Sequence, residues 1–522
     1  MVRFSADTIG RRQLLARVTG IAAVGVGILT ACGGTTATPS PAGSTSATAA
    51  ASTAAPATAG SAVTSAQAAT TASSAASSST ATSVAAATAA TTASSTASAV
   101  AAASKPAPTP TTGIVGTGNK AAVKIQWMSY FNPQDLGRLG DTFLPSYEKA
   151  QKGVAVEVII GPGGIIDSQQ KYLTLTAADV PPDLFGNTRP ATNLAQQGLY
   201  ADLSSLIKRD HFDLTKYNQQ WLQTQADYKG GVYGLPLSVH AEAPAMVYNR
   251  DLFQKAGVPE PPARWGDDAW TWETFLDAAR RLTVPSAAGT LTQAGVDSLA
   301  YSVHLPVLWE GNWVSQQLDK ATCAAQPMID TYTNYSDLTL KYKVMPGPTL
   351  KLAAGGFKGG TSAMSTMGSW EFGAYQALNT VNWAFMPFPK AKRSAYAFDP
   401  NMAYVAKSSK HLEETWNFVK WLDNGSYYAL FFNFMPVIAS DTATWSKTFF
   451  QNKPNVRPEV LVESLSLAQG IDPMFRVKGS DAFVRATVEP ALASLVAGKA
   501  EVAATLQGVQ PLLQGLIDQS PK

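Results

Sequence analysis

The chain has 522 residues, of which 45% are hydrophobic and 15% charged, and its formal net charge at pH 7 is +3. No basic patch with interleaved aromatic residues occurs, which argues against nucleic-acid binding. The four histidines have neither metal-ligand nor catalytic-triad spacing, so we predict no metal site, no cofactor and no catalytic residues.

The first 31 residues have the pattern of an export signal. Arg11 and Arg12 precede an apolar run over residues 14–31, which has the length of a signal-peptide core but is short for a membrane span. The arginine pair resembles a twin-arginine signal. Residues 29–32 resemble a lipobox, in which the cysteine, here Cys32, receives a diacylglyceryl group. The alternative is an ordinary cleaved signal in which Cys32 is incidental.

Residues 32–118 are dominated by Ala, Ser and Thr. The tract lacks the large apolar side chains that offset chain entropy, so we predict that it is disordered. Cys32 and this tract would then act as an anchor and a tether, which hold the folded part near the outer face of the cell membrane. A lipidated Cys32 leaves Cys323 without a disulfide partner, and we expect Cys323 to be a small buried residue.

The remaining part of about 400 residues is too long for a single core, so two domains are expected. Strand and helix patterns alternate along it, with Thr271 at the cap position of one amphipathic helix. The predicted strands cover residues 123–128, 154–160 and 183–185, and the predicted helices cover residues 141–152, 168–178, 272–282 and 412–422. This alternation predicts an α/β fold with parallel sheets covered by helices.

Several motifs in a fixed order resemble one known family. They include "KIQWMSYF", "QKYLTLTAADVPPDLF", "GGVYGLPLSVHAEAPAMVYNRDLF", "FKGGTSAMSTMGSWEFGAYQAL" and "YVAKSSKHLEETWNFVKWL". Together they resemble the sugar-type extracellular solute-binding proteins of ABC importers, over residues 120 to roughly 440. The resemblance implies a bilobal periplasmic-binding-protein-like fold with a ligand cleft between two hinged α/β lobes. Lobe 1 would comprise residues 119–238 and 387–434, and lobe 2 residues 239–386 and 435–522.

The same resemblance implies a function. An exported, lipid-anchored monomer would capture a neutral mono- or oligosaccharide between its lobes and deliver it to an ABC permease in the membrane. Two alternatives stay open, an exported glycoside hydrolase and a tethered surface adhesin. The hydrolase is suggested by tryptophans next to carboxylates, and the adhesin by the tether.

The first candidate ligand contacts lie in the motif "AMSTMGSWEFG" and in "SVHAEAPAMVYN", which resembles the family's crossover into the second lobe. Trp370 matches a tryptophan that stacks on sugar in maltose-binding relatives; the alternative is a core residue. Glu371 could accept hydroxyl groups or could serve the N-terminus of a helix. Glu242 matches a ligand-contacting glutamate in the crossover strand, and His240 would share its face of the strand.

The other candidates come from aromatic and polar side chains at predicted strand ends and in the motif "LWEGNW". Trp309, Asn312 and Trp313 would lie under the sugar, or the two tryptophans would be buried at a helix start. Trp127, Tyr130 and Asn187 fall at the carboxyl ends of predicted strands, where ligands of open α/β sheets bind. Asp399 would line the opposite wall, with a local turn as the alternative.

Overall fold

The computed structural model describes residues 112–115, 121–129, 137, 139–161, 164–240, 245–286, 289–299, 302–423, 434–453, 455–470 and 472–520. All of them belong to one compact unit, Val100–Lys522. The predicted signal peptide, Cys32 and the tether up to residue 111 lie outside the described residues, as do Tyr130 and Glu242. For His240 and Asp399 only the backbone is described.

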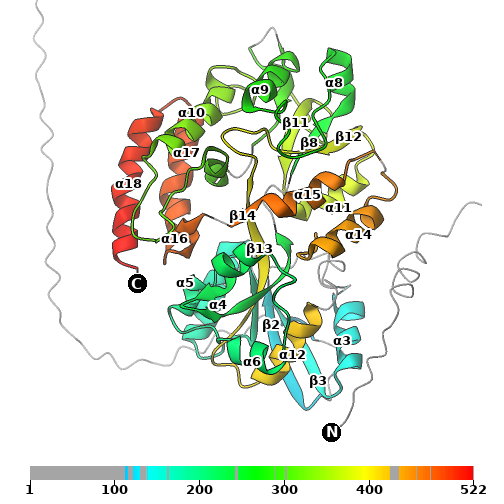
Figure 1. The fold of residues 1–522 in the computed structure, drawn as a ribbon, viewed down its shortest axis with the longest axis vertical. Helices are drawn as coiled ribbons and strands as arrows, with labels where there is room; N and C mark the ends of the chain where they lie inside the picture. Colours follow the sequence, from blue (N-terminus) through cyan, green and yellow to red (C-terminus); the bar gives the residue numbers. More distant parts are fainter. Residues whose placement is uncertain are drawn as a thin grey trace, which may run out of the picture. The chain divides into compact units, whose positions relative to one another are not determined.

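The first sheet has seven strands and contains all three strands predicted from the sequence (Figure 1). β2 (Val123–Ser129) lies between β3 (Val154–Ile160) and β4 (Leu184–Asn187) and pairs with both in parallel. β4 continues the sheet to β13 (Tyr396–Val405), which also pairs with β7 (Gly234–His240), both antiparallel. The outer strands are β1 (Thr112–Val115) and β14 (Ala468–Gly470).

Helices near the predicted positions accompany this sheet. They are α3 (Leu144–Ala150), which follows a π-helical turn at Leu139–Phe143, α4 (Ile165–Ala177) and α12 (Leu412–Leu422). A further helix, α6 (Ser204–Arg209), was not predicted. The ring of Trp127 in β2 packs edge-on against Phe418 of α12, with the ring centroids 5.3 Å apart. The sheet and these helices therefore share one aromatic core, which explains why the strands have near-continuous apolar runs.

The second sheet has five strands in the order β12-β8-β11-β10-β9. These strands are β12 (Trp383–Met386), β8 (Ala245–Asn249), β11 (Ser362–Met367), β10 (Leu291–Val296) and β9 (Val284–Pro285). β10 and β11 are parallel, and β8 is antiparallel to β11 and β12. The helix α9 (Trp272–Arg281) confirms the prediction at Thr271, whose hydroxyl accepts from the Thr274 amide.

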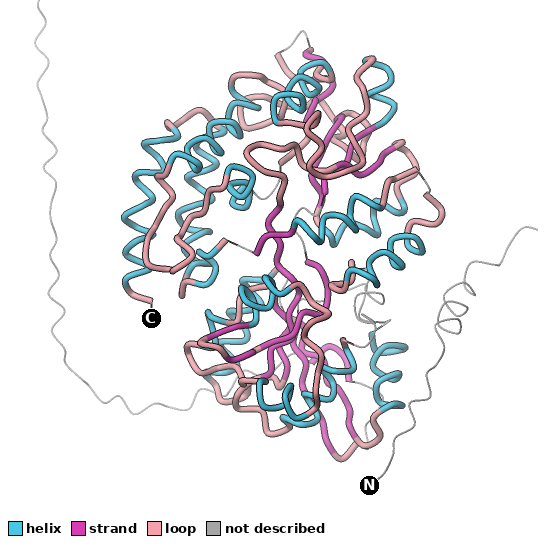
Figure 2. Tube along the Cα trace, viewed as in Figure 1, coloured by secondary structure: helices cyan, strands magenta, loops and turns pink. Residues whose placement is uncertain are grey.

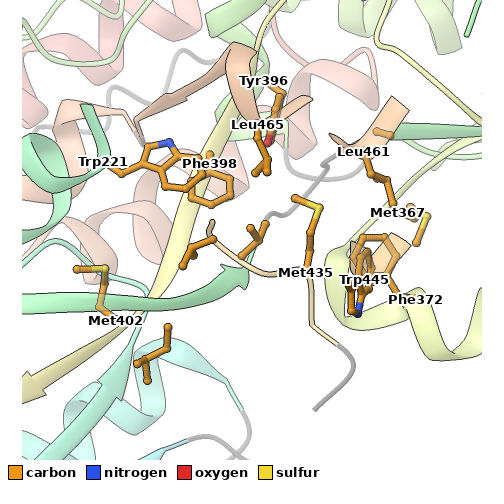
Figure 3. Packing of buried hydrophobic residues seen from close by; sticks show 14 of the residues in the cluster. Trp221, Met367, Phe372, Tyr396, Phe398, Met402, Met435, Trp445, Leu461 and Leu465 are labelled. Carbon is orange, nitrogen blue, oxygen red and sulfur yellow. The ribbon is translucent and has the colours of Figure 1, made fainter. Parts of the chain in front are cut away.

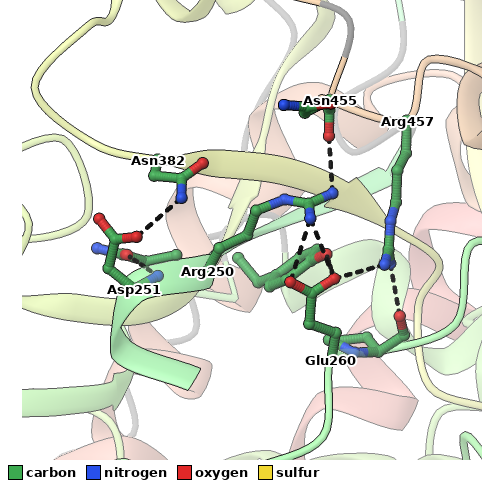
Figure 4. Close-up of polar contacts among 9 residues, drawn as sticks. Arg250, Asp251, Glu260, Asn382, Asn455 and Arg457 are labelled. Atoms are coloured by element: carbon green, nitrogen blue, oxygen red, sulfur yellow. Dashed lines mark hydrogen bonds and ion pairs between the residues drawn. The ribbon is translucent and has the colours of Figure 1, made fainter. Parts of the chain in front are cut away.

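Polar contacts fix the carboxyl end of β8 in the second sheet (Figure 4). Arg250, at the start of α8 (Arg250–Ala256), and Arg457 both donate to the carboxylate of Glu260. The Tyr248 hydroxyl donates to the same carboxylate at 2.9 Å. Because Arg457 lies about two hundred residues after Arg250, this cluster attaches the C-terminal part of the chain to β8.

The C-terminal part is mainly helical, as Figure 2 shows. Its helices include α14 (Ala439–Phe449), α15 (Glu459–Leu467), α16 (Ser480–Phe483), α17 (Glu489–Val496) and α18 (Val502–Asp518). A separate buried cluster joins α17 and α18 to α10 (Gln326–Leu340). Cys323 is buried in this cluster as a free thiol, in agreement with the sequence-based expectation.

The two sheets face one another with corresponding edges. β2, β3 and β4 end at the edge of the first sheet where β7 also ends, and β10, β11 and β12 end at the edge of the second sheet where β8 begins. The chain passes directly from β7 to β8 and from β12 to β13. The carboxyl ends of the parallel strands of both sheets therefore meet, and ligands of open α/β sheets bind at such edges.

Apolar packing fills the region where the chain crosses between the sheets (Figure 3). Trp221 stacks on Phe398 of β13 at a centroid distance of 4.0 Å. Met435 is fully buried, and its carbonyl accepts from the Val239 amide of β7 at 2.8 Å. Among the described residues, no helix is both long and apolar enough to cross a membrane.

Candidate ligand-binding site

The turn after β11 carries the most exposed indole at the meeting edges. Trp370 lies in a short 3₁₀ turn, Ser369–Glu371, before α11 (Phe372–Ala377). Its side chain is 38% exposed, and among the tryptophans of the chain, all of which are described, it alone is exposed. The Ser369 hydroxyl donates to the Val239 carbonyl of β7 at 3.3 Å. The turn thus belongs to the second sheet and contacts a strand of the first.

Glu371 stabilises this turn through both oxygens of its carboxylate. One carboxylate oxygen accepts the Gly368 amide at 3.0 Å, and the other lies 2.6 Å from the Lys358 ammonium. These contacts agree with the alternative that Glu371 serves the start of a helix. A carboxylate has further lone pairs, so a contact between Glu371 and ligand hydroxyls stays a prediction.

A polar pocket lies between elements that follow strands of the two sheets. Gln220 and Thr224 come from α7 (Gln219–Trp221) and the π-helical turn Leu222–Ala226, and Val303 and His304 come from the 3₁₀ helix Ser302–Trp309 after β10. The volume is about 180 Å³, below the roughly 300–1,000 Å³ of typical ligand pockets. The other lining residues are Pro306, Val307, Glu310, Gly311, Asn312, Gln316, Arg393, Asp472 and Pro473.

Asp472 is the buried carboxylate of this pocket. It accepts the amides of Trp313 at 2.8 Å and Met474 at 2.9 Å. Burial raises the pKa of Asp472 to about 6, although these hydrogen bonds and the nearby His304 oppose the shift. The pocket therefore contains a carboxyl group that changes charge in weakly acidic solution. Asp472 was not among the residues predicted from the sequence, although "DP" before a short helix indicates an N-terminal cap.

Asn187, at the end of β4, is buried beneath the C-terminal segment. Its side-chain oxygen accepts the amides of Thr188 and Arg189, at 2.7 and 3.1 Å. Arg189 forms a buried ion pair with Asp481 of α16 at 2.7 Å, and its guanidinium lies 4.4 Å from the Phe475 ring centroid. Asn187 thus shapes the turn that directs Arg189. A polar run, "GNTR", after a strand could have indicated Arg189, but no local pattern indicates Asp481.

Three of the predicted aromatic contacts have buried rings. Trp309 packs against Trp272 at a centroid distance of 4.8 Å, and the Trp313 indole N–H donates to the Val303 carbonyl at 3.0 Å. Trp127 lies in the core of the first sheet. In this conformation none of the three offers a ring face to a solute. Burial of Trp309 and Trp313 agrees with the alternative reading of their motif, but not at a helix start, because Trp309 ends a 3₁₀ helix and Trp313 lies in the loop after it. Asn312 is only partly buried and lines the pocket.

His240 and Asp399 are brought together by the backbone. They are paired residues of β7 and β13, at the meeting edge of the first sheet. Glu242 and Tyr130 lie outside the described residues, so their contacts stay predictions. Within the described part of the chain, no group of three or more His, Cys, Asp and Glu residues could hold a metal ion.

Comparison with known proteins assigns this arrangement to a family. Residues 123–423, more than half of the chain, match the family model described as "Bacterial extracellular solute-binding protein". A Brucella abortus (strain 2308) protein whose name designates it a binding protein is 32% identical over 123 residues. The 123 matched residues are 23% of this chain and 28% of the relative, so the chain spans less than a third of the relative's length in this match.

Solved structures with the same fold cover three quarters of the chain. An ABC substrate-binding protein of Listeria monocytogenes in complex with cycloalternan has a TM-score of 0.62 at 22% identity, over 76% of this chain and 99% of its own. UgpB of Mycobacterium tuberculosis with glycerophosphocholine has a TM-score of 0.63 at 16% identity, over 76% of this chain and 98% of its own. The MalE domain of Bdellovibrio bacteriovorus bound to maltotriose has a TM-score of 0.58 at 15% identity, over 76% of this chain and 100% of its own. The fold is thus the bilobal one predicted from the sequence.

Proposed function

Because the chain belongs to the bacterial extracellular solute-binding protein family, we propose that it is the receptor of an ABC importer and captures a neutral carbohydrate between its lobes. The lobes comprise residues 119–238 with 387–434, and 239–386 with 435–522. Lobe 2 contains the second sheet, and lobe 1 contains most of the first sheet, to which lobe 2 adds β14 and the end of β7. The carboxyl edges of the two sheets face each other. A solute bound there touches both lobes and so favours the closed state by its differential affinity.

The observation that carries this proposal is the exposed Trp370 ring beside the crossover strand β7. A sugar has an apolar face of C–H groups and a rim of hydroxyls. The C–H face requires a flat aromatic surface, and the hydroxyl rim requires amide and carboxylate groups that each accept or donate more than one hydrogen bond. The pocket residues Gln220, Glu310, Asn312 and Gln316 are of this kind.

Ligands bound by similar structures support a carbohydrate. Two of the three contain a bound oligosaccharide, cycloalternan or maltotriose, and the third contains glycerophosphocholine. Arg393 lines the pocket, and its Nε–H donates to the Val307 carbonyl at 2.8 Å. Since no cluster of cations lines the pocket among the described residues, a neutral solute fits it better than a phosphate.

Export and anchoring complete the proposal. The predicted signal, the lipidated Cys32 and the tether of residues 32–118 would keep the receptor at the outer face of the membrane, within reach of its permease. Such a tether of about 80 residues spans roughly 50 Å as a random coil. This distance lets the folded lobes bind solute and still reach a membrane protein.

A ligand panel tests the function directly. The purified chain is screened by thermal shift against maltotriose, cycloalternan, mannotriose and glycerophosphocholine, and each hit is titrated by calorimetry. We expect an oligosaccharide to bind once per chain, and at 100 times its Kd it adds about 2.7 kcal/mol to the free energy of unfolding. Binding of glycerophosphocholine alone would overturn the sugar assignment, and cleavage of the oligosaccharide would indicate a glycoside hydrolase instead.

A further inference from the structure

Gly368, which precedes the Trp370 turn, has an ordinary backbone conformation. Its φ of −82° and ψ of 152° lie in the extended region, which every residue with a side chain can adopt. The conformational freedom of glycine is therefore not needed at this position, and another property must require the absence of a side chain.

The position of the Trp370 ring requires that residue 368 has no side chain. A Cβ atom on Gly368 would lie 2.3 Å from Cζ2, 2.4 Å from Cε2 and 2.5 Å from Cη2 of Trp370. Contacts this short are far inside the van der Waals distance of about 3.5–4.0 Å between carbon atoms. The six-membered ring of the indole thus occupies the space that a side chain at position 368 would need, and it packs directly on the Gly368 backbone. We call this contact surface of Gly368 the seat of the indole.

The backbone at this point has little room to give way. The Gly368 amide donates to Glu371, which also pairs with Lys358. The next residue, Ser369, is buried and donates to Val239 of β7. A side chain at position 368 would therefore displace the indole before it displaced the backbone, because moving the backbone breaks these contacts as well.

We propose that Gly368 is a positioning residue: it provides the seat that holds the Trp370 indole in the orientation that binds the solute. This inference rests on the proposed function, in which the exposed part of that ring meets the sugar. One face of the indole packs on Gly368. The opposite face then stays available to a solute at the edge where the strands of the two sheets meet. A fixed ring also loses no side-chain freedom when a ligand arrives, which favours binding.

A double-mutant cycle tests the seat without any ligand. The four proteins are the wild-type chain, Gly368→Ala, Trp370→Ala and the double variant, and the readout is the emission spectrum with acrylamide quenching. Trp370 is the exposed indole among the twelve tryptophans, so Trp370→Ala removes the readily quenched component. We expect Gly368→Ala to change the wavelength and quenching of that component in the wild-type background and to change nothing in the Trp370→Ala background.

Gly373 is the matched control, because a Cβ atom there would meet nothing within 4 Å. It lies in α11, five residues after Gly368, so Gly373→Ala should leave the emission unchanged. The inference is overturned if Gly368→Ala behaves like Gly373→Ala, or if its effect is the same in the Trp370→Ala background.

The same proteins, titrated with maltotriose and mannotriose, separate this inference from the proposed function. We expect Gly368→Ala to weaken sugar binding by about tenfold, or about 1.4 kcal/mol, and to have no further effect once Trp370 is removed. If the emission cycle shows the seat but Trp370→Ala leaves sugar affinity unchanged, the proposed ligand role of Trp370 fails and the seat stands. If Trp370→Ala weakens binding but Gly368→Ala does not, the positioning role fails.

Discussion

The Trp370 ring offers a direct test of the binding site at the level of one side chain. Removing an aromatic ring that stacks on a ligand costs a few kcal/mol of binding free energy. We therefore expect Trp370→Ala to weaken saccharide binding by on the order of tenfold or more. Because the side chain is 38% exposed, solvent can fill the space that the ring leaves, and the folded state should be retained. Calorimetric titration with the saccharide from the ligand panel measures the affinity.

Leu512→Ala is a suitable control for that experiment. Leu512 is 57% exposed on α18 and takes no part in the meeting edges of the sheets. The control should bind the saccharide with wild-type affinity. Equal affinities for Trp370→Ala and Leu512→Ala, both with unchanged melting temperatures, would remove Trp370 from the site.

Asp472 makes the stability of the fold depend on pH. Burial raises its pKa in the folded state to about 6, from about 3.9 in the unfolded chain. The stabilisation is complete well below pH 4, where both states are protonated at this group. It is lost as the pH rises from about 4 through 6, because over that interval the unfolded state ionises while the folded state stays protonated. A shift of about two units corresponds to roughly 3 kcal/mol.

The variant Asp472→Asn isolates this contribution. Its side chain does not titrate, so the difference in unfolding free energy between wild type and variant should change between pH 4 and pH 6 and be constant above pH 7. Urea unfolding followed at several pH values measures the difference. A pH-independent difference over that interval would show that Asp472 has an unshifted pKa in the folded protein.

Two long-range ion pairs allow a comparison between elements. Arg189 and Asp481 are both buried and join the end of β4 to α16, whereas Asp167 of α4 and Arg485, just after α16, are about half exposed at 3.1 Å. Asp481→Ala removes the carboxylate that is paired with a buried guanidinium and should cost about 3–5 kcal/mol. Asp167→Ala removes a screened surface pair and should cost about 0–1 kcal/mol.

Chemical denaturation of the two variants gives both values. Gln169 also donates to Asp481, at 3.4 Å, so Asp481→Asn keeps part of the hydrogen bonding and should lie between wild type and Asp481→Ala. Equal losses for Asp481→Ala and Asp167→Ala would mean that the Arg189 pair is hydrated in solution and does not tie α16 to the first sheet.

The elements that could be predicted from the sequence are those with a local signal. β2, β3, α9 and α12 were predicted within a few residues because each has a regular apolar period or a side-chain cap. The pairing of β14 with β13 was not predictable, since three residues at 468–470 carry no strand pattern of their own. Its position is fixed only by tertiary contacts.

The same limit applies to the candidate site. Trp370 could be selected because "GSWE" after an apolar strand places an aromatic residue at a strand end. Trp309 and Trp313 were also predicted, from the motif "LWEGNW", but their rings pack against Trp272 and Tyr332 from other elements. Burial of an aromatic ring depends on what covers it, and the covering residues can lie far away in the sequence.

At the level of the whole molecule, ligand binding should be visible where the two sheets meet. The amide of Val239 donates to Met435, and its carbonyl accepts from Ser369, so these bonds connect segments on both sides of the crossover. If the solute favours the closed lobes, opening at this junction becomes rarer by the factor 1 + [L]/Kd, which is about 100-fold at 100 times Kd. Hydrogen exchange of the amides in β7 and in the Trp370 turn should slow accordingly.

Exchange along α18 provides the internal reference for this measurement. This helix packs in the separate C-terminal cluster, away from the meeting edges, so its local fraying should respond little to the saccharide. Protection centred on Val239 and Gly368 is the pattern expected of a solute held between two lobes. Protection centred on α18 instead would place the solute in the helical C-terminal part, and closure of the lobes would then not be coupled to binding.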